Sequence, residues 1–153
     1  MTIILTALLA MLPPEVEIAA VATLRGVPVN EAWAIHDTES GNVPEPLPNG
    51  GPLRNRDNVV SQGNVGRFQV NCPTWKRLTG NTTCEPLTNR HVNILAGVTI
   101  MARWRAKCRT GKPPCHRPRS THWSCHYNQG YSCTGHGVRY AGRVVEKMRR
   151  KPR

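Results

Sequence analysis

A glutamate at the end of an apolar helical run is the residue of this chain best suited to proton transfer. The run Trp33-Ala34-Ile35 precedes it, and Asn30 is expected to cap the helix after the break at Gly26-Val27-Pro28. Glu39 then falls in the last turn, where the negative end of the helix dipole raises the pKa of a carboxyl group. Partial burial raises that pKa further. Such a carboxyl group can give a proton to a glycosidic oxygen and later take one back.

The alternative for Glu39 is an ordinary solvated glutamate, which is the commoner state of this residue type. Three later stretches favour the chemical interpretation. They are Gly63-Asn64-Val65-Gly66-Arg67-Phe68-Gln69, Asn93-Ile94-Leu95-Ala96-Gly97 and His126-Tyr127-Asn128-Gln129-Gly130.

Together with Glu39-Ser40-Gly41-Asn42, these stretches resemble the four motifs of the soluble lytic transglycosylases, a goose-type-lysozyme-like family also known as the SLT domain. The family patterns are E-S-G-x-N, G-A-x-G-L-M-Q, N-I-x-A-G and A-Y-N-A-G. Each motif alone is a weak signal, but four in the same order at fitting distances are specific. The resemblance covers residues 15–150.

The resemblance implies a mostly α, lysozyme-like fold with a small irregular β/loop region and a cleft for peptidoglycan glycan strands. It makes Glu39 the sole catalytic acid and base. It implies no metal and no other cofactor. The substrate-binding positions that it implies are Ser40, Ser61, Phe68, Gln69, Tyr127, Asn128 and Tyr140.

Four departures from the family patterns are visible. The serine that the family often has three residues before the first glycine of the second motif falls at Val60, with Ser61 beside it. Asn42 comes one residue early. Arg67-Phe68 replaces Leu-Met before the glutamine, so a cation is expected to line the cleft. Gln129 replaces an alanine in the fourth motif.

Most glycosidases use two carboxylates, and this chain has few. Asp37 lies about 200° around the helix from Glu39 and therefore faces elsewhere. Asp57 is the remaining candidate for a second carboxylate. A single-glutamate mechanism needs none, and the resemblance implies a 1,6-anhydromuramoyl product from the MurNAc-β-1,4-GlcNAc bond. The alternative on the same fold is a hydrolytic muramidase in which Asp57 positions a water molecule.

The composition indicates one globular domain. Hydrophobic residues make up 39% and charged residues 20% of the 153 residues, which excludes a disordered chain. We expect an apolar lead over residues 1–14, the domain over 15–150 and a basic tail over 151–153. The lead is either a weak secretory signal without the usual positive start or a segment that packs on the core. It is too short to span a membrane, and we expect a monomer.

Charge is divided unevenly along the chain. Residues 1–85 carry six basic and eight acidic residues, a net charge of −2, whereas residues 86–153 carry fifteen and one, a net charge of +14. This half suits an anionic wall or envelope surface, or else a solvated face that binds nothing specific. A non-enzymatic module that binds nucleic acid or zinc is a further alternative. It leaves the four motifs unexplained, so no specific nucleic-acid partner is expected.

The six cysteines all lie between residues 72 and 133. Short separations pair Cys72 with Cys84, Cys108 with Cys115 and Cys125 with Cys133, although six cysteines allow fifteen complete pairings. Disulfides indicate an extracytoplasmic setting, whether periplasmic, secreted or associated with a phage virion or lysis. Zinc is the competing interpretation, because His116, His126 and His136 lie nearby, but no standard finger spacing is present.

The remaining patterns predict the elements that would hold these residues. Residues 41–58 are rich in Pro and Gly and predict a long loop. The longest helix is expected over Asn89–Lys107, where Gly97 either allows a close neighbour or sits at the surface. A strand at Val59-Val60 and further helices are expected, the helices at Pro13–Leu24, Thr74–Leu78, Thr121–Gln129 and Val138–Arg150.

Overall fold

The structure of the protein is a computed structural model that describes residues 12–40, 60–61, 63–110 and 121–150. This part of the chain is mostly helical with one small sheet, which confirms the expected fold class of mostly α with a small β region. The helices are α2 (Pro14–Leu24), α3 (Val29–Ser40), α4 (Cys72–Thr79), the 3-10 helix η2 (Glu85–Thr88), α5 (Arg90–Arg109), α6 (Cys125–Gln129) and α7 (Gly135–Arg149).

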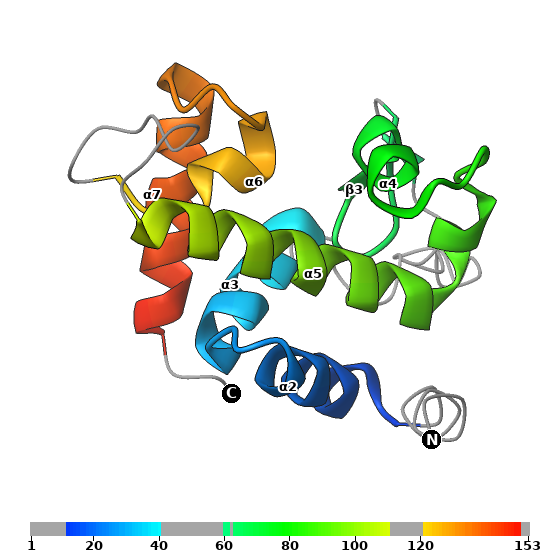
Figure 1. The fold of residues 1–153 in the computed structure, drawn as a ribbon. Helices are drawn as coiled ribbons and strands as arrows, with labels where there is room; N and C mark the ends of the chain where they lie inside the picture. The colour runs from blue at the N-terminus through cyan, green and yellow to red at the C-terminus, as the bar shows by residue number, and fades with distance from the viewer. Residues whose placement is uncertain (1–11, 41–59, 62, 111–120, 151–153) are drawn as a thin grey trace, which may run out of the picture.

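Helix α5 crosses the middle of the molecule, as the predicted longest helix should (Figure 1). Asn89 caps its start, because the Asn89 side chain accepts a hydrogen bond from the Val92 N–H at 3.2 Å. Helix α2 and η2 pack against α5, and α6 lies near its C-terminal end. Helices α4 and α6 stand on the same side of α5 with a space between them (Figure 1).

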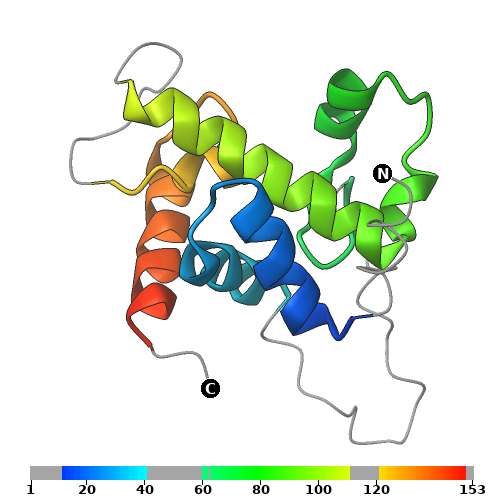
Figure 2. The ribbon, with the colours of Figure 1, turned by 60° about the horizontal axis from the view of Figure 1, so that its bottom comes forward.

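Helices α2, α3 and α7 form the other side of the core. Helix α3 contacts both α2 and α7, and Figure 2 shows these helices gathered under α5. Glu17 on α2 is fully buried and joins α2 to α5 through Arg90 Nε at 3.1 Å and His91 Nδ1 at 2.6 Å. A buried carboxylate needs such partners, because an unpaired charge is costly away from water. Helix α3 contacts α2 on one flank and α7 on the other, so packing on both sides sets its position.

The sheet has three very short antiparallel strands in the order β1 (Val60–Ser61), β2 (Asn64–Val65) and β3 (Val70–Asn71). Val65 pairs with both Val60 and Val70. Asn71 then caps α4, since its side chain accepts from the Thr74 N–H at 3.1 Å. The expected strand at Val59-Val60 is thus confirmed at Val60.

Several helix boundaries differ from those expected, and α4, for example, begins at Cys72 rather than Thr74. Helix α3 begins at Val29, so Asn30 lies inside it and the Pro28 carbonyl accepts from Glu31 and Ala32 instead. Helix α6 occupies only Cys125–Gln129 of the expected helix from Thr121. Helix α7 begins at Gly135 rather than Val138.

The start of α7 is set by a contact with a side chain of α6. The Gln129 side-chain oxygen accepts from the Gly137 N–H at 2.9 Å and from the Thr134 N–H at 3.2 Å. A side chain from α6 therefore supplies the cap that the Gly-rich stretch lacks locally.

Two of the expected disulfides are present, Cys72–Cys84 and Cys125–Cys133. Cys108 is also disulfide-bonded, while Cys115, its expected partner, lies outside the described residues. Cys125, His126 and Cys133 bring their ligand atoms within 4.8 Å of one another, but the two sulfurs are bonded to each other and offer no thiolate to zinc.

Several expectations fall on residues that the structure does not describe. These are the lead up to residue 11, the loop over 41–58 with Asp57, residues 111–119 of the basic link after Cys108, and the tail over 151–153. Among the described helices, none combines the length and the apolar character needed to cross a bilayer.

Candidate active site

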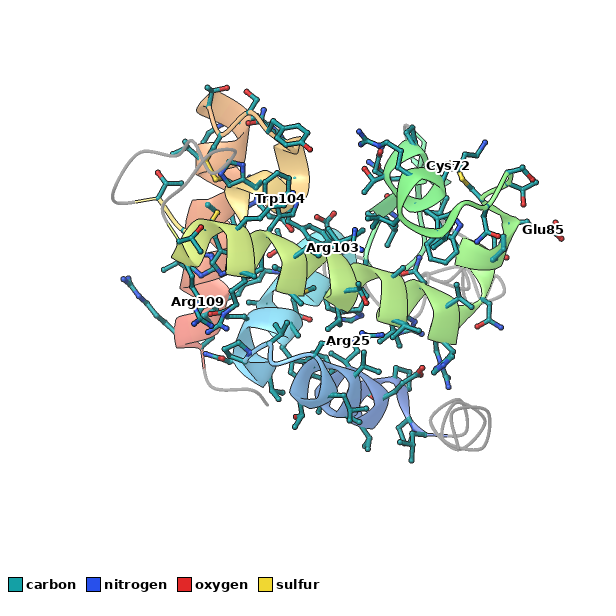
Figure 3. All side chains as sticks on the ribbon, viewed as in Figure 1. Arg25, Cys72, Glu85, Arg103, Trp104 and Arg109 are labelled. Carbon is teal, nitrogen blue, oxygen red and sulfur yellow. A yellow bond between two sulfur atoms is a disulfide. The ribbon has the colours of Figure 1, made fainter. Side chains whose placement is uncertain are left out.

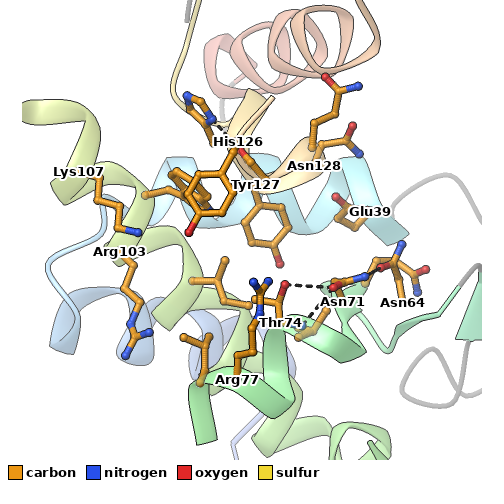
Figure 4. A pocket seen from close by; sticks show the side chains of 18 residues that line it. Glu39, Asn64, Asn71, Thr74, Arg77, Arg103, Lys107, His126, Tyr127 and Asn128 are labelled. Atoms are coloured by element: carbon orange, nitrogen blue, oxygen red, sulfur yellow. Dashed lines mark hydrogen bonds between the residues drawn. The ribbon is translucent and has the colours of Figure 1, made fainter. Parts of the chain in front are cut away.

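A pocket of about 610 Å³ lies between α4 and α6, where the sheet, α5 and the end of α3 meet (Figure 4). This volume is within the range of about 300–1,000 Å³ that is typical of ligand sites. Four of the predicted site residues line it, namely Glu39, Gln69, Tyr127 and Asn128. Residues from three distant motifs are therefore gathered at one cavity.

Glu39 lies at the wall of this pocket, in the last turn of α3. Its Oε1 accepts a hydrogen bond from the Tyr140 hydroxyl at 2.7 Å. Burial raises the pKa of Glu39 to about 7, although the Tyr140 hydrogen bond and the positive charge of Arg143 both oppose the rise. At neutral pH both the acid and the carboxylate are therefore populated, which a group that must give and take a proton requires.

Two tyrosines face this carboxyl group and remain protonated. Burial, and then the nearby charge of Glu39, raise the pKa of Tyr127 well above its ordinary value. The same two causes raise the pKa of Tyr140. Tyr140 lies on α7 and is buried, and its hydroxyl donates to Glu39. The packing of α7 on α3 brings the two residues together.

Two of the expected binding residues, Phe68 and Tyr140, are buried and do not line the pocket, so the prediction that these side chains bind substrate is wrong. Tyr140 contacts Glu39 instead, and the Phe68 ring is fully buried in the core. The Phe68 main chain is held from two sides, because its N–H donates to Asn93 Oδ1 at 2.9 Å and its carbonyl accepts from the Tyr127 hydroxyl at 2.8 Å. The ring lies so close to Gly97 that a Cβ there would come within 2.6 Å of it.

This anchoring fixes the next residue, Gln69. Gln69 has a positive φ of 44°, which is uncommon for a residue with a side chain. Its Nε2 donates to the Gly66 carbonyl at 2.8 Å, and its main-chain N–H donates to the same oxygen at 2.9 Å. Gly66 must be glycine, because its φ is 74° and a Cβ would meet the Asn93 side chain at 2.2 Å. The Gly66–Gln69 turn thus presents Gln69 to the pocket.

Helix α6 supplies the opposite wall. Tyr127 and the exposed Asn128 line the pocket from this short helix. The Cys125–Cys133 disulfide and the hydrogen bond between His126 Nδ1 and the Gly130 carbonyl, at 2.7 Å, hold the helix in place. Ser40 ends α3 and Ser61 lies in β1, but their side chains are outside the described part of the structure.

The cations of the pocket were missed by sequence reasoning. Among the described residues, its basic lining consists of Arg77 on α4 with Arg103 and Lys107 on α5, rather than Arg67. Trp104 lines the same end, stacked on His126 with ring centroids 4.8 Å apart, and Figure 3 shows it on the part of α5 that faces α6. The available signal was the spacing of Arg103 and Lys107, one helical turn apart on a predicted helix.

Within the described ranges of the chain, Glu39 is the only carboxylate that lines the pocket. Asp37 does not line the pocket, as its position on the helix relative to Glu39 predicted, and its Oδ1 lies 3.4 Å from His36 Nδ1. Comparisons of the chain with protein-family models, with curated proteins and with solved structures found no match. Function therefore has to be inferred from the residues of the pocket and their geometry.

Proposed function

We propose that this protein is a peptidoglycan lytic transglycosylase of the SLT type that cleaves the MurNAc-β-1,4-GlcNAc bond with Glu39 as its single acid and base. The observation that carries the proposal is the Glu39 carboxyl group, with a pKa of about 7, on the wall of a pocket shared with Gln69 and Tyr127. The resemblance of the four sequence motifs supports the choice of substrate.

In the proposed reaction, protonated Glu39 donates its proton to the glycosidic oxygen. The bond from that oxygen to C1 of MurNAc breaks, and the GlcNAc side leaves as an alcohol. The substrate's own N-acetyl group can stabilise the positive charge at C1, as in substrate-assisted glycosidases. Glu39, now a carboxylate, takes the proton of the MurNAc 6-hydroxyl, whose oxygen attacks C1. The product is a 1,6-anhydro sugar, no water is consumed, and Glu39 ends protonated.

The neighbours of Glu39 support this cycle. The Tyr140 hydroxyl stabilises the carboxylate that forms after the first proton transfer, because it donates to Oε1. Burial of the carboxyl group works in the opposite direction and keeps enough of the acid form for the first step. The two effects bring the pKa close to neutral pH.

Mass spectrometry of peptidoglycan digested by the protein tests the proposal. We expect muropeptides with 1,6-anhydro ends, which are lighter by one water than hydrated reducing ends. Glu39→Gln should abolish their release, because the amide cannot supply the proton. Hydrated ends alone would replace the proposal with a hydrolytic muramidase, the reaction in which Asp57 has a role. No cleavage by the wild-type protein would overturn the enzymatic proposal.

The proposed setting is extracytoplasmic, either periplasmic, secreted or phage-associated, with a monomer acting on the wall. Two disulfides are compatible with an oxidising compartment. The basic second half of the sequence supports attraction to an anionic wall or envelope surface. Activity on cells should then fall as salt is added, whereas activity that is independent of salt would remove this role.

A further inference from the structure

The end of the pocket opposite Glu39 is lined by cations. Figure 4 shows Arg103 and Lys107 on α5 across Tyr127 from Glu39, with Arg77 on α4 at the lower wall. All three side chains belong to exposed residues. In the part of the chain that the structure describes, none of the three forms an ion pair with a carboxylate, although Arg105 and Arg90 nearby do. Three cations thus face one cavity without an internal counterion from the described residues.

Aromatic rings hold one of these cations in place. The Lys107 ammonium lies 5.0 Å from the centroid of the Trp104 ring and 5.8 Å from that of Tyr131. Trp104 and Tyr131 contact each other edge to face with centroids 5.5 Å apart, and both line the pocket. A cation positioned on an aromatic surface loses less freedom when it binds an anion.

The substrate of the proposed function explains which anion these cations would meet. The sugars of a glycan strand carry no charge of their own, because the lactyl acid of MurNAc is tied up in the amide bond to the stem peptide. The stem peptide ends in carboxylates and carries others on its side chains. Arginine and lysine side chains pair with carboxylates through charge-assisted hydrogen bonds.

We infer that Arg77, Arg103 and Lys107 form a subsite for the stem-peptide carboxylates, so that the protein prefers glycan strands whose stem peptides carry free carboxylates to strands in which these carboxylates are amidated. The inference rests on the proposed function and deepens it. The cleavage chemistry at Glu39 is common to both substrates, and the preference arises at the other end of the same pocket.

The test compares two substrates made from one preparation, namely uncrosslinked glycan strands with their stem peptides and the same strands after their stem-peptide carboxylates have been converted to amides, which leaves the lactyl amide bond intact. For the wild-type protein we expect kcat/KM to be about five- to tenfold higher on strands with free stem-peptide carboxylates, the effect of two or three exposed charge pairs. For Arg103→Gln/Lys107→Gln the ratio of the two kcat/KM values should fall to about one. Arg103→Lys, which keeps the charge, should keep most of the preference.

A matched control separates a local subsite from general attraction. Lys76→Gln/Arg109→Gln removes the same two charges from exposed positions of α4 and α5 that do not line the pocket. This variant should keep the wild-type ratio. A partly unfolded variant lowers both rates equally, so the ratio remains a valid measure even if stability falls.

The outcomes distinguish the two proposals. Equal cleavage of both substrates by the wild-type protein would leave the transglycosylase proposal intact and overturn the subsite. The subsite would also be overturned if the control variant lost the preference as fully as Arg103→Gln/Lys107→Gln. Cleavage of neither substrate would overturn the proposed function and the subsite with it.

Discussion

Tyr140 donates a hydrogen bond of 2.7 Å to Oε1 of Glu39, although the two residues are 101 positions apart in the sequence. Helix α7 packs against α3, so two residues of α7, Tyr140 and Arg143, lower the pKa of the Glu39 carboxyl group against the larger effect of burial. Burial and this hydrogen bond act on the same carboxyl group with opposite sign.

Tyr140→Phe is expected to move the pH dependence of activity. Removing the hydroxyl removes an interaction that lowers the pKa of Glu39, so the pKa rises above about 7. The free energy of a hydrogen bond to a charged group is large enough that its loss should move the alkaline limb of the pH–rate profile to higher pH by about one unit. The measurement is kcat/KM for glycan cleavage between about pH 5 and pH 9, a range that brackets the shifted carboxyl group.

Tyr131→Phe is the matched control for that experiment. It removes a phenolic hydroxyl from the same pocket without removing the contact with Glu39. Its alkaline limb should coincide with that of the wild type. A Tyr140→Phe profile that does not move would contradict the role assigned to this hydrogen bond.

Glu39→Gln is expected to stabilise the protein at neutral pH. Because burial raises the pKa of Glu39 from 4.5 to about 7, the folded protein binds a proton that the unfolded chain releases. The stability due to this group is complete below pH 4.5 and is lost as the pH rises through 7. The amide does not titrate, so the variant should gain up to about 3 kcal/mol at about pH 7.5 relative to about pH 4.

Denaturant unfolding at the two pH values measures this difference. The wild-type protein and Glu39→Gln should differ in their free energy of unfolding more at about pH 7.5 than at about pH 4. A difference that is the same at both pH values would show that the carboxyl group titrates normally, and the proton-transfer role of Glu39 would lose its physical basis.

Gly97→Ala is expected to destabilise the fold although it replaces a glycine inside a helix. The new Cβ would lie 2.6 Å from Phe68 Cβ, and Phe68 is fully buried and cannot move aside freely. Overpacking of this kind costs about 1–3 kcal/mol, which exceeds the helix-propensity gain of about 1 kcal/mol. Gly142→Ala in α7 is the matched control, because nothing lies within 4 Å of its Cβ position. The control should be stabilised, and thermal unfolding of both variants checks the pair.

Asn93→Ala is expected to lose about 2–4 kcal/mol of unfolding free energy, because three buried hydrogen bonds disappear together. Asn93 accepts from the Phe68 N–H and donates to the carbonyls of Val65 and Leu87. Asn81→Ala, at an exposed site, should change stability little. Cleavage by Asn93→Ala should also fall at temperatures where it stays folded, since Gln69 follows the anchored residue. Stability like that of the wild type would contradict the anchoring role.

Local signals were sufficient for most of the helices. The 3.6-residue apolar pattern predicted α5, and Asn89, the first residue of the expected helix, is its N-cap. Glu39, Gln69, Tyr127 and Asn128 were expected at one site because their motifs follow one another in a familiar order, and the structure places them at one pocket. Their chemical roles remain predictions.

The features that sequence reasoning missed depend on contacts between distant residues. The start of α7 depends on Gln129 from another helix, which no local pattern around Gly135 reveals. Phe68 was expected to contact substrate, but Gly97 leaves room for its ring in the core. The cations of the pocket come from α4 and α5, since the fold and not the motif decides which arginine faces the cavity.

The turn that ends at Gln69 has a thermodynamic consequence for any ligand of the pocket. Two hydrogen bonds to the Gly66 carbonyl immobilise both the main chain and the side-chain amide of Gln69. Its rotational entropy is therefore given up during folding rather than during binding. A ligand of the pocket therefore meets a Gln69 side chain that is already ordered, and its binding free energy does not include the entropic cost of ordering that side chain.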